Sequence, residues 1–600
     1  MPSDPLSIYQ HLRDARRRET EALTRSADRV SKLRLATFFV GIALAWATVS
    51  GGWLSVWWLG VPVAVFIGLV VVHNRLLLNR DQVTRSVAWY EHGIARIEDR
   101  WSALGSPGDR FQNADHLFAQ DLDLFGEGSL FQLLNTAQTQ TGEETLAAWL
   151  QTPVDRVEIT DRQEAVRELS PRATLRERLA TLVAAKTHAA VHPTALAAWA
   201  TAAPALHGVW PRVAALALSL LSVAAIIAWG RGADGMLPLL SLAALAALAI
   251  PFGKRTERVM RAADGPAYEL SVLGQVCGVL REETYTSPRL LALRAGLETT
   301  AGEAQQVVGK LQRLIELHDW QHNILFAPIA ALLLWKLHCA FAVEAWRARH
   351  GDEVETWLRH VGEFEALSAL ATYAYEHPAD PFPELAETDG SPVYEAEALA
   401  HPLIPAATAV ANDVALGASP QVLIVSGSNM SGKTTLLRSI GVSAVLALMG
   451  APVRAGRLRL SPVAIGATLR IEDSLQAGRS RFYAEVIRLG QIVTTARIRP
   501  TLFLFDELFH GTNSHDRTEG ARGLLRSLVH LNAIGLVTTH DLALAEIGEQ
   551  LAPKAGNVHF DDTLVDDEMR FDYCLKAGPV TRSNAIAIMR AVGLDLPNDD

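Results

Sequence analysis

The sequence predicts a multidomain chain in which an α-helical region with transmembrane hairpins precedes an α/β domain with a phosphate-binding loop. Three observations lead to this fold class. The chain has 600 residues, more than one hydrophobic core usually organises. Two long apolar stretches interrupt its first half. From residue 421 onward, short β-rich runs alternate with helical segments.

The composition indicates contact with lipid. Hydrophobic residues make up 49% of the chain and its mean hydropathy is +0.14, both high for a soluble protein. The net charge of -10 excludes a globally basic nucleic-acid binder, although a local basic face can exist within an acidic total. Cys277, Cys339 and Cys574 lie far apart, so neither a disulfide framework nor a zinc site is predicted.

The first apolar stretch predicts a membrane hairpin. Residues 35–74 contain no charged side chain, and a spanning helix needs roughly 20 apolar residues, so this stretch is long enough for two. Gly51 and Gly52 provide a tight turn beside a tryptophan cluster at 53–58, which suits the membrane interface. The 34 residues before it are polar and basic, which does not fit a cleavable signal peptide.

The second apolar stretch, residues 213–253, predicts another hairpin with a break at 231–234. Its alanine-rich and leucine-rich composition also suits buried helices of a soluble bundle, and this alternative stays open. Basic residues flank both hairpins, including Arg75 and Arg80 after the first and Lys254 after the second. The positive-inside tendency then predicts a multi-pass protein of the cytoplasmic membrane, with its α/β domain in the cytoplasm.

The remaining segments predict a helical scaffold and a linker. Apolar spacing predicts long helices over 128–200 and 255–375. A short apolar run, 324–335, cannot cross a bilayer and predicts a buried or interfacial helix. The proline-rich segment 377–405 predicts a linker. The resulting organisation is a basic segment (1–34), hairpin 1 (35–74), helical core (75–212), hairpin 2 (213–253), second core part with linker (254–400) and α/β domain (401–600).

A phosphate-binding loop is predicted at the start of the α/β domain. The apolar run 421–426 has strand character and precedes GSNMSGKT, which matches GxxxxGK[ST] between a strand and a helix. Glycines let backbone N–H groups surround phosphates, the lysine reaches the outer phosphates, and the hydroxyl after it binds Mg²⁺. The predicted nucleotide-binding residues are Gly427, Ser428, Asn429, Met430, Ser431, Gly432, Lys433, Thr434 and Thr435.

Two further predicted strands place catalytic side chains beside this loop. The run 501–505 ends in Asp506 and Glu507, and the run 533–539 ends at His540. Asp506 is predicted to hold Mg²⁺ with Thr434, and Glu507 to polarise the attacking water. A histidine there can hydrogen-bond the γ-phosphate. The predicted activity is Mg²⁺-dependent ATP hydrolysis, with catalytic roles for Lys433, Glu507 and His540.

These motifs resemble those of the MutS mismatch-repair family. SGSNMSGKTT is similar to the family's TGPNMxGKST, and DELFHGTNSHD at 506–516 is similar to DExxRGTSTxDG. The segment 473–485 resembles DDLxxGxSTFMxE, although Arg481 replaces a threonine. The resemblance also covers a core segment, about 115–200, and all of 360–600. It implies an ATP-driven homodimer in which Ser480 reaches the partner's nucleotide, with DNA as the bound partner.

Two features of the sequence depart from the family. Ala409 and Val410 stand where many members have an aromatic residue that stacks on adenine. The predicted hairpin 1 also leaves no room before the core for mismatch-reading domains, and Phe125 and Glu127 match the residue types of the mismatch wedge only by coincidence.

Two other functions fit parts of the sequence. An ABC exporter also joins membrane helices to one ATPase, but four predicted spans are fewer than its usual six and an LSGGQ-like motif is missing. A membrane scaffold that uses ATP only as a switch would not need Glu507.

Overall fold

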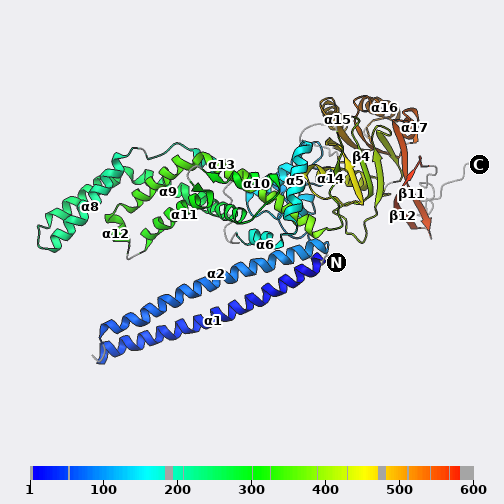
Figure 1. Cartoon of the computed structure of the whole chain (residues 1–600). Helices are drawn as coiled ribbons and strands as arrows, with labels where there is room; N and C mark the ends of the chain where they lie inside the picture. The colour runs from blue at the N-terminus through cyan, green and yellow to red at the C-terminus, as the bar shows by residue number, and fades with distance from the viewer. Residues whose placement is uncertain are drawn as a thin grey trace, which may run out of the picture.

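The computed structural model describes residues 4–51, 55–182, 193–206, 208–299, 302–323, 326–387, 390–428, 430–470, 481–509, 512–540, 542–565 and 568–580. A long helical region occupies one part of the molecule and an α/β domain the other (Figure 1). Two helical hairpins extend from the helical region away from the α/β domain (Figure 1). The predicted order of a helical region followed by an α/β domain is confirmed.

The predicted hairpin 1, residues 35–74, lies within a longer pair of helices, α1 (Pro5–Gly51) and α2 (Gly60–Ile97), with the short helix η1 (Val56–Leu59) between them. We call the whole pair hairpin 1. The two helices pack against each other along their length, as Figure 1 shows in blue. The most apolar window of α1 is 0% buried and that of α2 is 6% buried. Exposing so much apolar surface to water is unfavourable, whereas a lipid environment would accommodate it.

Hairpin 2 consists of α8 (Trp210–Gly230) and α9 (Met236–Glu282). Their apolar windows are 17% and 11% buried, so these helices are not the core of a bundle within this chain. Together with α1 and α2, they give four described helices that are long and apolar enough to cross a membrane.

The first part of the core differs from the predicted long helices. Between residues 109 and 201, the described residues form one 3-10 turn and five helices: η2 (Asp109–Phe111), α3 (Leu130–Leu134), α4 (Gln140–Gln151), α5 (Arg156–Leu169), α6 (Ala173–Thr181) and α7 (Pro193–Thr201). The interruptions have local causes. Ser129, Thr139 and Asp155 each accept a backbone N–H and cap a new helix, and Pro153 falls between α4 and α5.

The second part of the core centres on α13 (Trp335–Glu376), which packs against α4, α5, α7 and α9. It is preceded by α10 (Pro288–Ala295), β1 (Glu298–Thr299), β2 (Gly302–Glu303), α11 (Ala304–Asp319), η3 (Trp320–His322) and α12 (Ala327–Leu332). The predicted interfacial run 324–335 therefore contains a helix of six residues.

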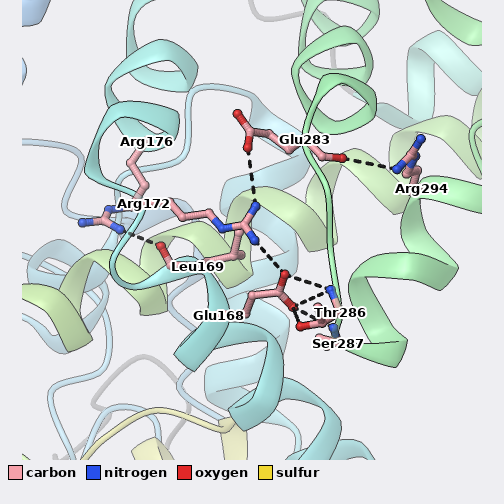
Figure 2. Close-up of polar contacts among 8 residues, drawn as sticks. All are labelled: Glu168, Leu169, Arg172, Arg176, Glu283, Thr286, Ser287 and Arg294. Carbon is pink, nitrogen blue, oxygen red and sulfur yellow. Dashed lines mark hydrogen bonds and ion pairs between the residues drawn. The ribbon is translucent and has the colours of Figure 1, made fainter.

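Glu168 joins the two parts of the core, as Figure 2 shows. Its carboxylate accepts hydrogen bonds from the backbone N–H groups of Thr286, at 2.9 Å, and Ser287, at 2.7 Å. These groups lie at the start of α10, where a negative charge is favourable. Arg172 donates to the same carboxylate at 2.8 Å and approaches Glu283 at 3.5 Å, so α5 and the end of α9 are held together.

The α/β domain is built on a six-stranded sheet in the order β12-β11-β6-β10-β9-β8. All neighbours are parallel except β12, which pairs antiparallel with β11 at one edge. The strands are β6 (Val422–Ser426), β8 (Ala464–Thr468), β9 (Thr501–Asp506), β10 (Ile534–Thr539), β11 (Ala555–Val565) and β12 (Glu568–Ala577). The accompanying helices are α14 (Lys433–Met449), α15 (Arg481–Ala496), α16 (Ser514–His530) and α17 (Leu542–Gln550).

Two strands of a second sheet lie in the segment 377–405, which was predicted to be a linker. The order of this sheet is β3-β7-β4-β5, with β3 (Glu384–Leu385), β4 (Tyr394–Leu399), β5 (Asn412–Leu416) and β7 (Arg457–Leu460). The linker prediction was wrong because β4 is short and alternates buried Tyr394 and Ala396 with exposed glutamates. Its pairing partners, β5 and β7, come later in the chain.

Candidate functional site

The carboxyl ends of three central strands meet at one edge of the six-stranded sheet. In the register of β10 with β6, Thr539 pairs with Ser426. In the register of β10 with β9, Thr538 pairs with Asp506. The residues that follow these strands, including Gly427, are therefore brought to the same edge, where open α/β sheets bind ligands.

The loop 427–432 needs glycine at both ends. Gly427 and Gly432 have φ values of +152° and +106°, in a region that residues with a Cβ rarely adopt. A Cβ at Gly427 would also lie 2.9 Å from the Ser431 hydroxyl. The hydroxyl oxygens of Ser428 and Ser431 are buried without a hydrogen-bond partner among the described residues. Buried polar atoms normally have a hydrogen-bond partner, so these two hydroxyl groups are consistent with a polar ligand bound in the loop.

Lys433 is the first residue of α14 and is held across the loop. Its Nζ donates to the carbonyl oxygens of Gly427, at 2.6 Å, and Ser428, at 2.8 Å. Burial lowers the pKa of Lys433, while Glu507 and Asp506 oppose the shift. A cation at the start of a helix, next to unpaired N–H groups, is suited to bind an anion.

Thr434 and Asp506 are already in contact. The Thr434 hydroxyl donates to the Asp506 carboxylate at 2.7 Å. Thr538 donates to the other carboxylate oxygen of Asp506, and the Glu507 backbone N–H donates to the Thr538 hydroxyl at 3.2 Å. One hydroxyl and one carboxylate are the oxygen ligands that Mg²⁺ uses together with water and substrate phosphates.

Glu507 and His540 form a second polar pair. His540 Nε2 lies 2.7 Å from a Glu507 carboxylate oxygen, and about a third of the histidine side chain is exposed. Glu507 has a φ of +49°, an uncommon left-handed conformation for a residue with a side chain. Phe509, two residues later, is anchored by its backbone N–H to Glu485 of α15 at 2.7 Å. The turn after β9 is therefore fixed on both sides of the glutamate.

A cavity of about 510 Å³ opens over the loop. Its wall includes Thr435, Ala409, Val410 and Met430, of which Met430 is 84% exposed. The full lining is Leu399, His401, Ile404, Thr408, Ala409, Val410, Asn412, Ser428, Met430, Gly432, Lys433, Thr434, Thr435, Leu436, Ser439, Glu507, Phe560 and Tyr573. The volume falls within the range of small-molecule and cofactor sites.

The sequence did not predict the aromatic wall of this cavity. Tyr573 of β12 lies over the loop, with ring atom Cδ1 3.2 Å from a Cβ built at Gly432. Asn412 of β5 fixes this strand, donating to the Tyr573 carbonyl at 3.0 Å and accepting from the Leu575 N–H at 2.6 Å. Phe560 of β11 lines the same side. No local pattern links Asn412 with Tyr573, which is why these residues were missed.

Two predicted site residues, Asn429 and Ser480, lie outside the described residues. The other predicted nucleotide, magnesium and catalytic residues come from the loop 427–435 and the ends of β9 and β10.

Comparison with known families agrees with this arrangement. The model for MutS domain V matches residues 423–598, and the model for MutS domain III matches residues 111–188. The chain is therefore similar to MutS proteins in two separate segments, which together cover less than half of its length. The two matches confirm the resemblance seen in the sequence, and they overlap the two ranges from which it was drawn.

A curated relative gives the same result. The chain is 30% identical over 256 residues to the DNA mismatch repair protein MutS 2 of Halobacterium salinarum. The alignment covers 42% of this chain and 29% of the relative. The chain therefore matches less than a third of that MutS protein.

Phe125 has a structural role here. Its ring lies 5.7 Å from both Phe111 and Phe131, and it packs against the main hydrophobic core. This contact agrees with the interpretation that its similarity to the mismatch wedge is coincidental.

Proposed function

We propose that this chain is a membrane-anchored ATPase of the MutS type that acts as an ATP-dependent dimeric clamp. The proposal is supported most directly by the arrangement at the edge of the six-stranded sheet. There, Thr434 contacts Asp506 and Glu507 contacts His540 beside the loop 427–432. Loop N–H groups and Lys433 would hold the phosphates, and Thr434 and Asp506 would hold Mg²⁺, which supplies charge neutralisation. Glu507 would orient and polarise water, and His540 would respond to the γ-phosphate.

The aromatic wall suggests how the base is held. Tyr573 and Phe560 line the same cavity as Ala409 and Val410. A ring on β12 would compensate for the missing aromatic residue at 409–410, because aromatic faces stack on bases of any sequence.

The nucleotide-binding part of this proposal is tested with Lys433→Ala. The variant should lose ATP binding at concentrations that saturate the wild type, because the cation that bridges the loop is gone. Equilibrium binding of a fluorescent ATP analogue to detergent-solubilised full-length protein measures this. Lys554→Ala is the matched control, since Lys554 contacts Ala418 outside the cavity. Equal affinities for both variants and the wild type would contradict the site.

Membrane anchoring is supported by the apolar exposure of both hairpins. We expect single-cysteine labels at Ser50 and Gly235 to react with an impermeant maleimide from outside the cell. The exposed native Cys574 should react only after permeabilisation if the α/β domain lies in the cytoplasm, as we propose. Release of intact protein by high salt without detergent would overturn this topology.

DNA is proposed as a partner because the relative is a DNA mismatch repair protein. Phe125 is packed in the core, so we expect any binding to go through phosphates, with little preference for a mismatch. Such binding should weaken steeply between low and moderate salt. Titration of matched, mismatched and branched duplexes at two salt concentrations measures this. Strong selectivity for a single mismatch would contradict the prediction.

The two other functions are less well supported. The matches to two MutS domain models disfavour the ABC exporter. The position of Glu507 beside Lys433 in the cavity disfavours a scaffold without ATP hydrolysis.

A further inference from the structure

The segment between α11 and α13 lies beside hairpin 2. After α11, the chain passes through η3 and α12 before α13 begins at Trp335. Helix α12 contacts α8, and Figure 1 shows it near α8 and α9, far from the α/β domain.

An apolar groove separates α12 from the hairpin. Its volume is about 480 Å³ and its lining residues are Ile226 from α8, Leu242, Leu245, Ala246 and Ala249 from α9, and Pro328, Ile329, Ala331, Leu332 and Leu334. Every lining residue is apolar. Ile329 is 49% exposed and Leu242 is 44% exposed, so the groove continues onto the apolar outer surface of hairpin 2.

The position of this groove along α9 places it at membrane depth. Ala249 precedes Lys254 by about 8 Å along the helix axis, and Leu242 precedes it by about 18 Å, at 1.5 Å per residue. If Lys254 marks the cytoplasmic boundary, the groove begins in the cytoplasmic leaflet and extends past the middle of a bilayer core of about 30 Å.

Several backbone N–H groups around α12 have partners within the protein, which favours contact with lipid. Polar backbone groups in hydrocarbon need partners within the protein. Ala327 and Phe326 donate to Asn323, Ala330 donates to Phe326, and Leu333 donates to Ile329. Beyond the helix, His338 donates to the Leu334 carbonyl.

Aromatic and basic side chains mark the boundary of this segment. The Phe326 ring lies 6.1 Å from Trp320 and 5.4 Å from Trp335, and Trp320 is 58% exposed. Tryptophan is enriched at the membrane interface. The side chains of Arg212, near the start of α8, and of Lys254 and Arg255, in the middle part of α9, are exposed. Exposed cations at this level favour anionic headgroups.

We propose that α12 enters the cytoplasmic leaflet and that the groove holds an acyl chain of an anionic phospholipid. The inference rests on the proposed membrane anchoring by hairpin 2. It adds a third lipid-contacting element and a defined lipid site between α9 and α12.

The depth of α12 is tested by fluorescence quenching in liposomes of phosphatidylcholine and phosphatidylglycerol that contain doxyl-labelled lipid. Full-length protein with Cys574→Ser carries one labelled cysteine at Ile329, at Leu220 of α8 or at Leu291 of α10; Cys277 and Cys339 are buried. Leu220 is 62% exposed and Leu291 is 45% exposed. We expect quenching at Ile329 and Leu220 but not at Leu291.

The outcomes separate the two proposals. If the label at Leu220 is quenched and the labels at Ile329 and Leu291 are not, α12 does not enter the bilayer, while the proposed anchoring by hairpin 2 is retained. Absence of quenching at both Leu220 and Ile329 would overturn the anchoring itself.

Occupancy of the groove is tested with a phosphatidylglycerol that carries a diazirine on its acyl chain. Photocrosslinks should map to residues 326–334 and should fall severalfold in Ala246→Trp, which fills the groove. Ala247→Trp is the matched control, because Ala247 is exposed on the same helix and does not line the groove. Removing Lys254 and Arg255 should reduce the preference for phosphatidylglycerol over phosphatidylcholine by about fivefold per charge. Equal crosslinking in both tryptophan variants would overturn the lipid site.

Discussion

Glu507→Gln should bind ATP with Mg²⁺ normally and hydrolyse it at least about 100-fold more slowly than the wild type, since general-base assistance contributes about 10² to 10⁴ in rate. Glutamine preserves the size of the side chain but cannot accept a proton from water. Lys433 Nζ donates to the carbonyl oxygens of Gly427 and Ser428, and the Thr434 hydroxyl donates to Asp506, so these hydrogen bonds of the phosphate-binding loop should remain intact. ATP should then accumulate unhydrolysed, and the variant should be trapped as a closed dimer.

Single-turnover phosphate release and ATP binding, measured on the same full-length preparation, check this expectation. Glu546→Gln is a matched control, because Glu546 is exposed on α17 and does not line the cavity. It should turn over ATP like the wild type. If Glu507→Gln hydrolyses ATP at the wild-type rate, Glu507 is not the residue that activates water. If the variant no longer binds ATP, the substitution disturbs the phosphate-binding loop.

The sequence was sufficient to predict those parts of the candidate site that follow directly from the order of strands along the chain. Each strand that leads to Gly427, Glu507 or His540 is a short apolar run, and parallel strands bring their carboxyl ends to one edge. The two helical hairpins were also predictable, because a long apolar stretch without charged residues predicts a helix that can span a bilayer.

Contacts between distant segments could not be predicted in this way. Thr538 was part of a predicted strand, but its hydrogen bond to Asp506 depends on the register of β9 with β10. Tyr573 reaches the cavity only because an antiparallel strand is added at the sheet edge and Asn412 fixes it. Strand β4 was hidden for the same reason, because its partners come later in the chain.

The contact between hairpin 1 and the core also joins segments that are far apart in the sequence. Arg96, near the end of α2, donates to both carboxylate oxygens of Glu376, at the end of α13, at 2.7 and 2.6 Å. The Arg96 side chain is 10% exposed and that of Glu376 is 0% exposed. Tyr9 and Tyr90 pack beside this pair at the base of the hairpin. Beyond Glu376 the chain enters the second sheet, which adjoins the candidate nucleotide cavity through Leu399.

Arg96→Met should therefore lower the free energy of opening at the base of hairpin 1 by about 3–5 kcal/mol, because Glu376 is left buried without a countercharge. Hydrogen exchange of full-length protein in detergent, followed at the amides of residues 86–97, measures this local stability. Arg100→Met is the matched control: Arg100 pairs with Glu98 on the surface, and its loss should cost under about 1 kcal/mol. Adding Glu376→Leu to Arg96→Met should restore most of the protection, since an apolar pair of similar volume replaces a buried ion pair at little cost. If Arg96→Met exchanges no faster than Arg100→Met, the ion pair does not hold the hairpin to the core, and the aromatic cluster around Tyr9 would have to carry that contact alone.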